Sequence, residues 1–387
     1  MPSLSSPSNY SKSRQKKETR KSSLIESHKL AKLKDAERRA TKTKVKLEDL
    51  AMFTQQLSSM LMAGLPLVTA MEALQEQVVN LVFRVIIRNV RLDVASGVPF
   101  SEACEKYPKA FPKLFVSMVL AGEASGNLAD ILLKTSKYFD ESVKLSKKVK
   151  SAMTYPVTVI LFAIILVNLL LIFVIPVFSD MFESFGSELP APTQFLLNLS
   201  LFLKKYVVFV LFGFFAIWYL AGMFFRTPKG RIAKDFLLVK LPIFGPLVRK
   251  ISLSRFCRTF SILMKSGVPI LQSLEIVASG ANNVYIERAC TEISRNVRQG
   301  GQISEVLGVN PYFPSMIKYM TQAGEQTGDI DSMMVKISDF YDVEIDNTVS
   351  SLTSLLEPLL IVTLGIVIGS IVMCMFLPIF KMPTIIN

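Results

Sequence analysis

The chain has 387 residues, half of them hydrophobic, and its 44 basic and 31 acidic residues give a formal net charge of +13. This hydrophobic share lies above the range of an ordinary soluble fold. The four cysteines form no CxxC pair and His28 is the single histidine, which argues against a disulfide framework, a zinc site and a Ser-His-Asp triad. No GxxxxGKS/T or GxGxxG motif occurs, so a P-loop nucleotide site is excluded, and we expect no cofactor, metal site or enzymatic activity.

Residues 1–46 are the most basic part of the chain, with fourteen Lys or Arg residues against four acidic residues. They contain almost no apolar run, so we expect no secretory signal peptide and predict a disordered basic arm. The arm either contacts anionic lipid headgroups or is a solvated tail. Because the rest of the chain is close to neutral, we expect no nucleic-acid binding.

Three stretches contain no charged residue, and they comprise residues 151–179, 206–225 and 358–380. A helix needs about 20 apolar residues to cross the hydrocarbon core of a bilayer, so each stretch is predicted to be a transmembrane helix. Their one strongly polar side chain is Asn168. A pump or proton-coupled carrier usually needs ionisable groups at membrane depth, so this composition argues against one.

Basic residues flank two of these stretches and predict the orientation of the chain by the positive-inside rule. Four lysines precede the first stretch, and four Lys or Arg residues follow the second: Lys144, Lys147, Lys148, Lys150, Arg226, Lys229, Arg231 and Lys234. The connection between the two stretches begins with acidic residues. We therefore expect residues 180–205 and 381–387 to lie outside, and residues 1–150 and 226–356 to lie in the cytoplasm.

An internal repeat organises the chain. The segment FTQQLSSMLMAGLPLVTAMEAL from Phe53 matches FCRTFSILMKSGVPILQSLEIV from Phe256, and AGEASGNL from Ala121 matches AGEQTGDI from Ala323. The offset, which is the number of residues between matched positions of the two copies, decreases by only one over the whole repeat. So constant an offset indicates duplication of one unit, a helical domain followed by one span. Because each unit ends in a crossing, two tandem copies reach the same side only through an additional crossing, which residues 206–225 supply.

The predicted fold is therefore all-α and integral to the membrane, with two homologous cytoplasmic helical bundles of about six helices each and three transmembrane helices. The predicted segments are the arm 1–46, bundle 47–150, span 151–179, external loop 180–205, span 206–225, bundle 226–356, span 357–380 and external tail 381–387. The last helix of each bundle, from about Leu128 or Ile330, is expected to continue into the following span, with Pro156 and Pro358 near the membrane entrance.

Glycine, proline and serine mark corresponding helix ends in the two copies. Gly64 and Gly267 suit the left-handed position after a helix, and Pro66 and Pro269 suit the first turn of the next one. Ser101 and Ser304 are predicted to be N-caps.

Two GExxG motifs also correspond: Gly122, Glu123 and Gly126, and Gly324, Glu325 and Gly328. Their carboxylates either contact a partner or cation, or accept hydrogen bonds from backbone or basic donors where the chain turns; we favour the structural reading. Glu357, just before Pro358, is either an interfacial side chain with its carboxylate in water or a contact in a subunit interface.

These motifs together resemble the GspF/PilC family of inner-membrane platform proteins of type II secretion and type IV pilus machines. The resemblance rests on AGLPLVTAMEAL, KSGVPILQSLEIV, both AGExxG segments, TPKGR from Thr227 and LEPLL from Leu356, and it covers about residues 47–381. The residues at family motif positions are Gly64, Pro66, Gly122, Glu123, Gly126, Gly267, Pro269, Gly324, Glu325, Gly328, Glu357 and Pro358. Many members begin with a folded segment ahead of the first bundle, where this chain is expected to have the basic arm alone.

The resemblance implies a protein of the cell inner membrane that couples a cytoplasmic assembly ATPase to polymerisation of pilin or pseudopilin subunits. The implied partners are that ATPase, the pilin-like subunits, other inner-membrane components of the machine, membrane lipid and further copies of the chain. The alternatives are a transporter built from repeats and a membrane-anchored scaffold. One span per repeat leaves little to line a transport pathway, which weighs against the transporter. The sequence does not distinguish secretion, pilus assembly and DNA uptake.

Overall fold

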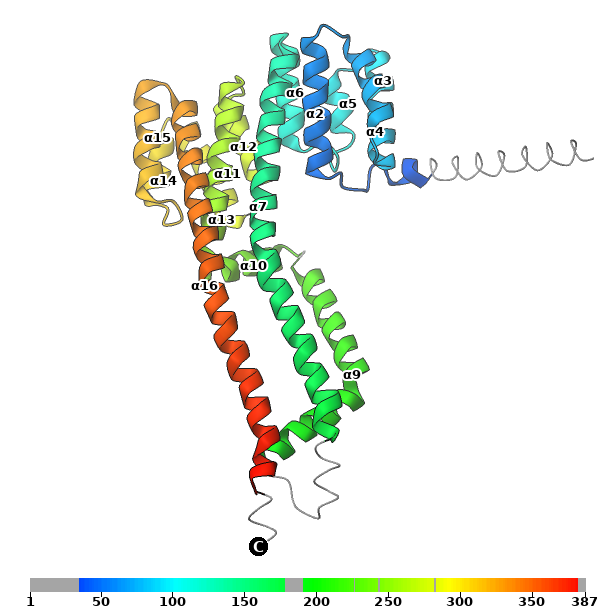
Figure 1. The fold of residues 1–387 in the computed structure, drawn as a ribbon. Coiled ribbons are helices and arrows are strands. Elements are labelled where there is room, and N and C mark those ends of the chain that lie inside the picture. Colours follow the sequence, from blue (N-terminus) through cyan, green and yellow to red (C-terminus); the bar gives the residue numbers. More distant parts are fainter. Residues whose placement is uncertain (1–34, 178–190, 226, 243, 282, 382–387) are drawn as a thin grey trace, which may run out of the picture. The chain divides into compact units, whose positions relative to one another are not determined.

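A computed structural model describes residues 35–177, 191–225, 227–242, 244–281 and 283–381 (Figure 1). Every regular element in these ranges is a helix, which confirms the predicted all-α fold. The chain divides into two compact units. The first runs to Lys144 and resumes from Arg255 to Ile337, and the second holds Leu145–Ser254 and the chain from Ser338 onward.

The two sequence repeats fold into matching series of six helices within the described ranges. The first series is α2 (Leu47–Met62), α3 (Leu67–Gln77), α4 (Leu81–Ala95), α5 (Phe100–Glu105), α6 (Lys113–Ser125) and α7 (Leu128–Leu169). The second is α11 (Gly245–Lys265), α12 (Ile270–Gly280), α13 (Val284–Arg298), α14 (Ile303–Val309), α15 (Ser315–Thr327) and α16 (Ile330–Lys381). The first residues of α5 and α14 are separated by the same number of positions as Phe53 and Phe256, whereas the first residues of α6 and α15 are separated by one position fewer. The one-residue shift therefore lies between the start of α5 and the start of α6, and between the starts of α14 and α15.

Phenylalanine rings fill the centre of the first bundle. Phe53 of α2 and Phe111 before α6 are each 1% exposed, with ring centroids 6.3 Å apart. Phe256 and Phe313 occupy the corresponding places in the second bundle, with ring centroids 5.4 Å apart. A buried aromatic pair contributes about 0.5–1.5 kcal/mol beyond its area burial. Because the pair recurs at corresponding positions, the duplication preserved this core contact as well as the order of the helices.

The two bundles contact one another within the first compact unit. Helix α6 of the first repeat packs against α12 of the second. Tyr138 of α7 is hydrogen-bonded to Thr259 of α11 at 2.8 Å, and Arg258 forms an ion pair with Glu141 at 3.1 Å. These contacts join the repeats side by side through their own helices.

Glycine ends the first helix of each bundle as predicted. Gly64 and Gly267 have φ angles of 85° and 79°, in the left-handed region that other residues rarely adopt. Pro66 and Pro269 are the N-cap residues of α3 and α12, one position earlier than the first helical turn in which the sequence placed them.

The prediction that Ser101 and Ser304 are N-caps is wrong. The N-cap residues are Pro99 in α5 and Gln302 in α14, and each serine is the second residue of its helix. Proline cannot supply a side-chain acceptor, so the N-terminus of α5 needs an acceptor from elsewhere in the chain.

Residues 35–46 differ from the predicted disordered arm. Ala36, Ala40 and Val45 are at most 5% exposed. Glu37 forms an ion pair with Arg88 of α4, and the Val45 N–H donates to the carbonyl of Lys109 at 3.3 Å. Small and apolar side chains among the many charges therefore pack on the first bundle, and the rest of the predicted arm, residues 1–34, lies outside the described residues.

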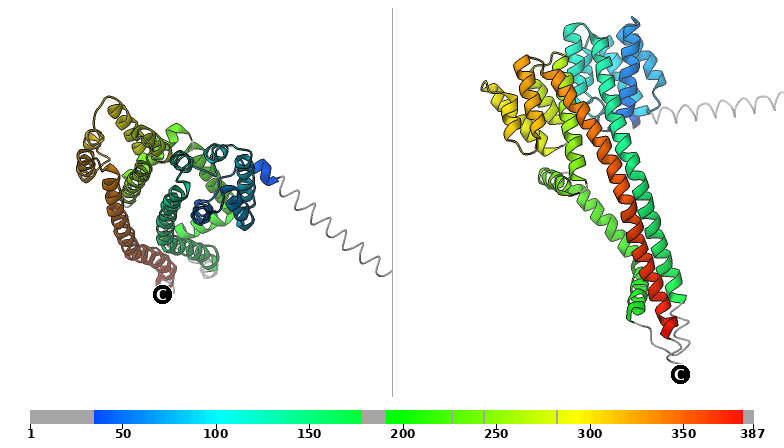
Figure 2. Two further views of the ribbon diagram at one scale, coloured as in Figure 1. Left: turned by 90° about the horizontal axis from the view of Figure 1, so that it is seen from above. Right: turned by 60° about the vertical axis from the view of Figure 1, so that its left-hand side comes forward.

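Two of the described helices are long and apolar enough to cross a membrane. They comprise Leu128–Val177 and Ile330–Phe376, and each begins in a bundle and continues through one of the predicted spans. Both helices continue past Pro156 and Pro358, and Figure 2 shows each as a continuous ribbon. The π-helix η1 (Leu170–Val174) extends α7. Bundle and span of each repeat thus share one helix.

Helix α9 (Ala191–Phe224) covers the remaining predicted span and begins earlier than expected, so residues 191–205 of the predicted external loop are helical. Ser200 of α9 donates a hydrogen bond to the carbonyl of Leu171 in η1, and Thr193 donates to the carbonyl of Cys374 in α16 at 2.6 Å. A π-helical turn loosens the backbone hydrogen-bond ladder, and the serine hydroxyl gives one of its carbonyls a partner. Aromatic side chains such as Phe212 and Trp218 are about two-thirds or more exposed, as lipid-facing residues would be.

A polar and apolar contact joins three helices of the second unit just before the apolar segments. Lys250 of α11 donates to Glu344 at 2.8 Å and to Thr348 at 2.9 Å, both on α16. Lys148 of α7 forms an ion pair with Asp346 of α16. The apolar cluster beside them consists of Leu247, Ile345, Val349 and Leu352, with Leu145, Val149, Ala152 and Ile251 packed against it. The helices α7, α11 and α16 are therefore fixed to one another here.

Three of the four cysteines are buried, and their chemistry gives a test of the bundle cores. Burial raises the pKa of the Cys104 and Cys257 thiols well above the usual value and raises the pKa of Cys290 to about 12. We predict that these thiols do not react with a maleimide reagent in the native protein, even when the pH is raised from about 7 to about 9, where an exposed thiol ionises. Mass spectrometry after labelling with and without denaturant measures this; rapid native labelling at any of the three would contradict the packing.

Candidate functional site

The two GExxG motifs occupy the same place in each repeat. The first ends α6 just before α7 begins, and the second ends α15 just before α16 begins. Each motif therefore stands at the joint from which the long bundle-to-span helix starts. This position makes the pair of joints the candidate functional site.

The last glycine of each motif ends the preceding helix. Gly126 and Gly328 are C-cap residues with φ angles of 69° and 74°. The N–H of Asn127 donates to the carbonyl of Gly122 at 3.0 Å, and Asp329 donates to Gly324 at 2.9 Å. A six-to-one hydrogen bond around a left-handed residue is the Schellman motif, which reverses the chain tightly.

The first glycine of each motif allows close approach of the next helix. A Cβ atom at Gly122 would lie 3.1 Å from the Cα of Leu128, and one at Gly324 would lie 2.9 Å from the Cα of Ile330. Both contacts are with the backbone at the start of the long helix. Any larger residue would push that start away, so the glycine fixes where α7 or α16 begins.

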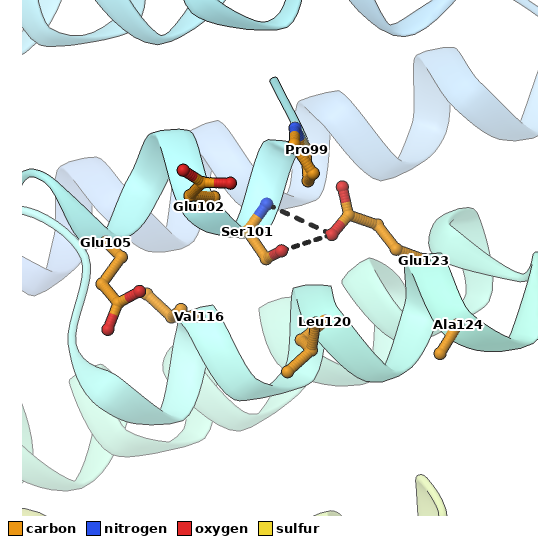
Figure 3. Close-up of a pocket in the computed structure, with 8 residues that line it drawn as sticks. All are labelled: Pro99, Ser101, Glu102, Glu105, Val116, Leu120, Glu123 and Ala124. Atoms are coloured by element: carbon orange, nitrogen blue, oxygen red, sulfur yellow. Dashed lines mark hydrogen bonds between the residues drawn. The ribbon is translucent and has the colours of Figure 1, made fainter. Parts of the chain in front are cut away.

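The glutamate of the first motif caps the short helix α5. The Phe100 N–H donates to Glu123 Oε1 at 2.6 Å. The Ser101 N–H and hydroxyl donate to Oε2 at 3.3 and 2.5 Å (Figure 3). A carboxylate here satisfies N–H groups that have no partner within the helix and lies at the positive end of the helix dipole. Glu123 thus supplies the acceptor that the N-cap Pro99 lacks.

The second motif repeats this arrangement. The N–H groups of Ile303 and Ser304 donate to Glu325 Oε1 and Oε2 at 2.5 and 3.3 Å. Each glutamate accepts backbone hydrogen bonds inside its own repeat, which is the structural role favoured from the sequence. Among the described residues, no cluster of three or more His, Cys, Asp or Glu could hold a metal ion.

Further repeated contacts at the joints were not recognised from the sequence. The Ser58 hydroxyl donates to the backbone carbonyl of Ala129 at 3.0 Å, and the Ser261 hydroxyl donates to the backbone carbonyl of Asp331 at 2.9 Å. These contacts bind the first helix of each bundle to the first turn of its long helix. The signal was available, because Ser58 and Ser261 are separated by the same offset as Phe53 and Phe256.

Asn80 and Asn283 form a second such pair. Each amide oxygen accepts hydrogen bonds from two N–H groups at the start of α4 or α13. Asparagine is among the preferred N-cap residues, so the two positions, which have the same separation again, could have been found from the repeat alone.

The structure does not bring Glu357 into these joints. Glu357 and Pro358 lie within α16 and are exposed. Glu357 makes no hydrogen bond or ion pair with the described part of the chain. Of the residues singled out from the sequence, the glycines, prolines and glutamates of the bundles lie at helix ends, whereas Glu357 and Pro358 lie along an apolar helix.

Two helical bundles, each sharing a helix with an apolar span, define a tandem-repeat membrane protein. The family model described as "Type II secretion system (T2SS), protein F" matches residues 53–176 and again residues 256–378, so the chain belongs to this family. The matched segments are the two repeats, and the resemblance seen in the sequence is confirmed.

Several known proteins are similar over most of their length. "Type IV pilus assembly protein PilC" of Myxococcus xanthus is 40% identical over 335 residues, covering 87% of this chain and 80% of that protein. The PilC protein of Thermus thermophilus is 41% identical over 336 residues, covering 87% and 82%. "Type II secretion system protein F" of Vibrio cholerae is 33% identical over 343 residues, covering 89% and 84%.

We predict that Glu123→Gln and Glu325→Gln each lower the free energy of unfolding by about 1–2 kcal/mol, because an amide loses the negative charge that the capped N–H groups face. The midpoint of unfolding of the detergent-solubilised protein measures the effect. Glu76→Gln is the matched control, since Glu76 is exposed on α3 and far in sequence from either joint. Equal midpoints for Glu123→Gln and Glu76→Gln would show that the cap is not stabilising.

Proposed function

We propose that this protein is an inner-membrane platform of a type IV pilus or type II secretion machine, and that it couples a cytoplasmic assembly ATPase to polymerisation of pilin or pseudopilin subunits. Family membership and the names of the similar proteins support a component of such machinery. The protein is proposed not to be an enzyme itself, because its sequence offers no P-loop and no triad. The energy for assembly would then come from the partner ATPase.

The observation that carries the coupling proposal is the continuity of α7 and α16. Each runs without a break from its bundle into an apolar segment that can cross the membrane. A displacement of a bundle by a cytoplasmic partner would therefore be transmitted along a single helix. The contacts of Lys250 and Lys148 with α16 would make α7, α11 and α16 move together rather than slide.

The proposed topology places both bundles in the cytoplasm, with residues 47–150 and 226–356 as the bundle segments. Residues 180–190 and the tail 381–387 would lie outside, and the chain would cross three times. Basic flanks around the first two spans support this orientation. The partners would be the ATPase, pilin-like subunits, other inner-membrane components, lipid and further copies of the chain.

Two other functions share parts of this description. A repeat-built transporter would need a pathway through the membrane, and each repeat supplies one apolar helix. A membrane scaffold would bind partners without supporting filament assembly. Neither accounts for the similarity to pilus and secretion proteins along the whole repeat.

We predict that the tagged full-length protein, purified from gently solubilised membranes, retains an assembly ATPase and pilin-like subunits, and that the protein alone does not hydrolyse ATP. Quantitative mass spectrometry of the co-purified proteins and a phosphate-release assay measure the two results. The type of pilin-like subunit recovered distinguishes pilus assembly from secretion. ATP hydrolysis by the isolated protein, or a preparation without any assembly component, would contradict the proposal.

A further inference from the structure

An open groove of about 580 Å³ lies between α5 and α6 of the first bundle (Figure 3). Its apolar lining comes from Pro99, Val116, Leu120 and Ala124. Leu120 is 49% exposed although it stands on a helix whose other face is buried in the bundle core. A leucine that is exposed within a hollow can be covered by an apolar side chain of a partner, unlike a leucine on a flat polar face.

Carboxylates border this apolar lining. Glu123 is occupied by its capping hydrogen bonds. Glu102 and Glu105 are exposed, and neither forms an ion pair or hydrogen bond with the described residues. The groove therefore combines an apolar floor with two carboxylates that form no ion pair with the described residues.

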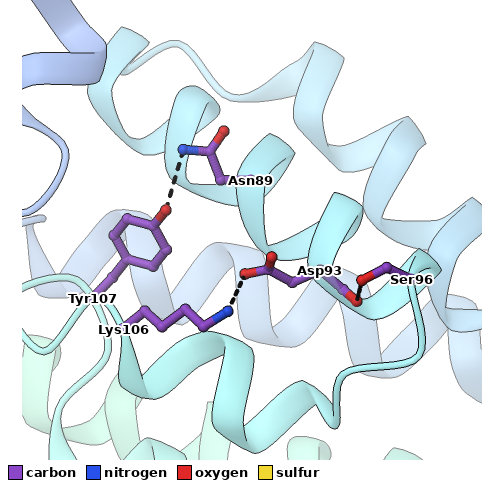
Figure 4. Close-up of polar contacts among 5 residues, drawn as sticks. All are labelled: Asn89, Asp93, Ser96, Lys106 and Tyr107. Atoms are coloured by element: carbon purple, nitrogen blue, oxygen red, sulfur yellow. Dashed lines mark hydrogen bonds and ion pairs between the residues drawn. The ribbon is translucent and has the colours of Figure 1, made fainter.

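The two lysines between α5 and α6 form contacts elsewhere in the bundle. Lys106 forms an ion pair with Asp93 of α4 at 3.0 Å, beside the hydrogen bond between Asn89 and Tyr107 (Figure 4). Lys109 donates to the carbonyl of Lys42 at 3.1 Å. Lys106 and Lys109 thus bind α4 and the segment before α2, and neither forms an ion pair with Glu102 or Glu105.

The second repeat shows the same place already filled. Lys318 stands where Val116 stands in the first repeat, and Gly308 replaces Glu105. A Cβ atom at Gly308 would lie 2.8 Å from the Cδ of Lys318, so the lysine side chain lies across this position. Gln322 and Gln326 replace Leu120 and Ala124, so the corresponding floor in the second repeat is polar.

The carboxylate that corresponds to Glu102 is also satisfied in the second repeat. Glu305 accepts from the Asn296 side chain at 3.0 Å and from the Gln302 N–H at 3.2 Å, and these bonds lower its pKa. The second repeat therefore provides its own lysine stem and its own donors. The first repeat lacks them and exposes both the apolar floor and the charge.

We propose that the α5–α6 groove of the first bundle docks a short segment of a soluble component of the machine, and that this segment presents an apolar side chain flanked by Lys or Arg. This inference rests on the proposed function, which supplies the class of partner. The apolar side chain would contact Leu120, and the basic side chains would face Glu102 and Glu105. The partner's side chains would cover the groove of the first repeat, as the Lys318 side chain covers the corresponding place in the second repeat.

The test is photo-crosslinking in living cells from the full-length chain, with p-benzoylphenylalanine in place of Leu120 and, as the matched control, in place of Gln322. Mass spectrometry then identifies the crosslinked peptide. The expected result is a crosslink from position 120 to an apolar segment flanked by Lys or Arg in another protein of the machine. Glu102→Lys combined with Glu105→Lys should lower its yield about tenfold, and Gln322→Glu should leave it unchanged.

Other crosslinks would overturn the proposal. A crosslink to residues 1–34 of the same chain would assign the groove to the basic arm, and a crosslink to a second copy would make it a self-association surface. A yield insensitive to the two charge reversals would show that the carboxylates do not select the ligand. If assembly components co-purify but no such crosslink forms, the groove proposal fails and the proposed function stands; if neither is recovered, both fail.

Discussion

The constraint on which the rest of the structure depends is that each repeat shares one helix between its bundle and its membrane segment. A helix satisfies its own backbone hydrogen bonds and can pass from water into lipid without a break. If each apolar segment crosses the membrane, each copy of the unit ends on the opposite side from where it began. Two copies with bundles on the same side would need one additional crossing, and the proposed topology assigns that crossing to α9, which lies between the two repeats in the chain. The hydrogen bonds of Ser200 and Thr193 fasten α9 to the segments that end the two repeats.

The joint where the shared helix starts is built from very few side chains. Gly126 turns the chain, Gly122 lets α7 begin against α6, and Glu123 ties the same turn to the N-terminus of α5. Their counterparts in the second repeat make the same contacts. A carboxylate is suited to this role because it accepts two hydrogen bonds and complements the helix dipole at once. The joint thus fixes where the long helix begins relative to the helices of its bundle.

The order of bundles and apolar segments along the chain was predictable, because it depends on sequence features that do not require the local structure to be known. A long charge-free run, and a repeat offset that changes by only one residue between Phe53 and Glu123, do not depend on how side chains pack. Local capping was not predictable in the same way. Ser101 was placed at the N-cap because serine is a common capping residue, whereas the acceptor is Glu123, which lies 22 residues further along the chain. Burial of Ala36 and Val45 was hidden by the surrounding lysines and arginines.

The proposed mechanism requires both bundles to lie on the same side of the membrane, and single introduced cysteines can report the side of each. Glu76→Cys reports on the first bundle, Gln299→Cys on the second and Ser184→Cys on the connection between the first two spans, each with Cys374→Ala and with the buried native thiols left in place. We expect a membrane-impermeant maleimide to label position 184 in intact spheroplasts and to label positions 76 and 299 only after permeabilisation. Labelling of positions 76 and 299 from opposite sides would contradict the mechanism, because α9 would then not cross.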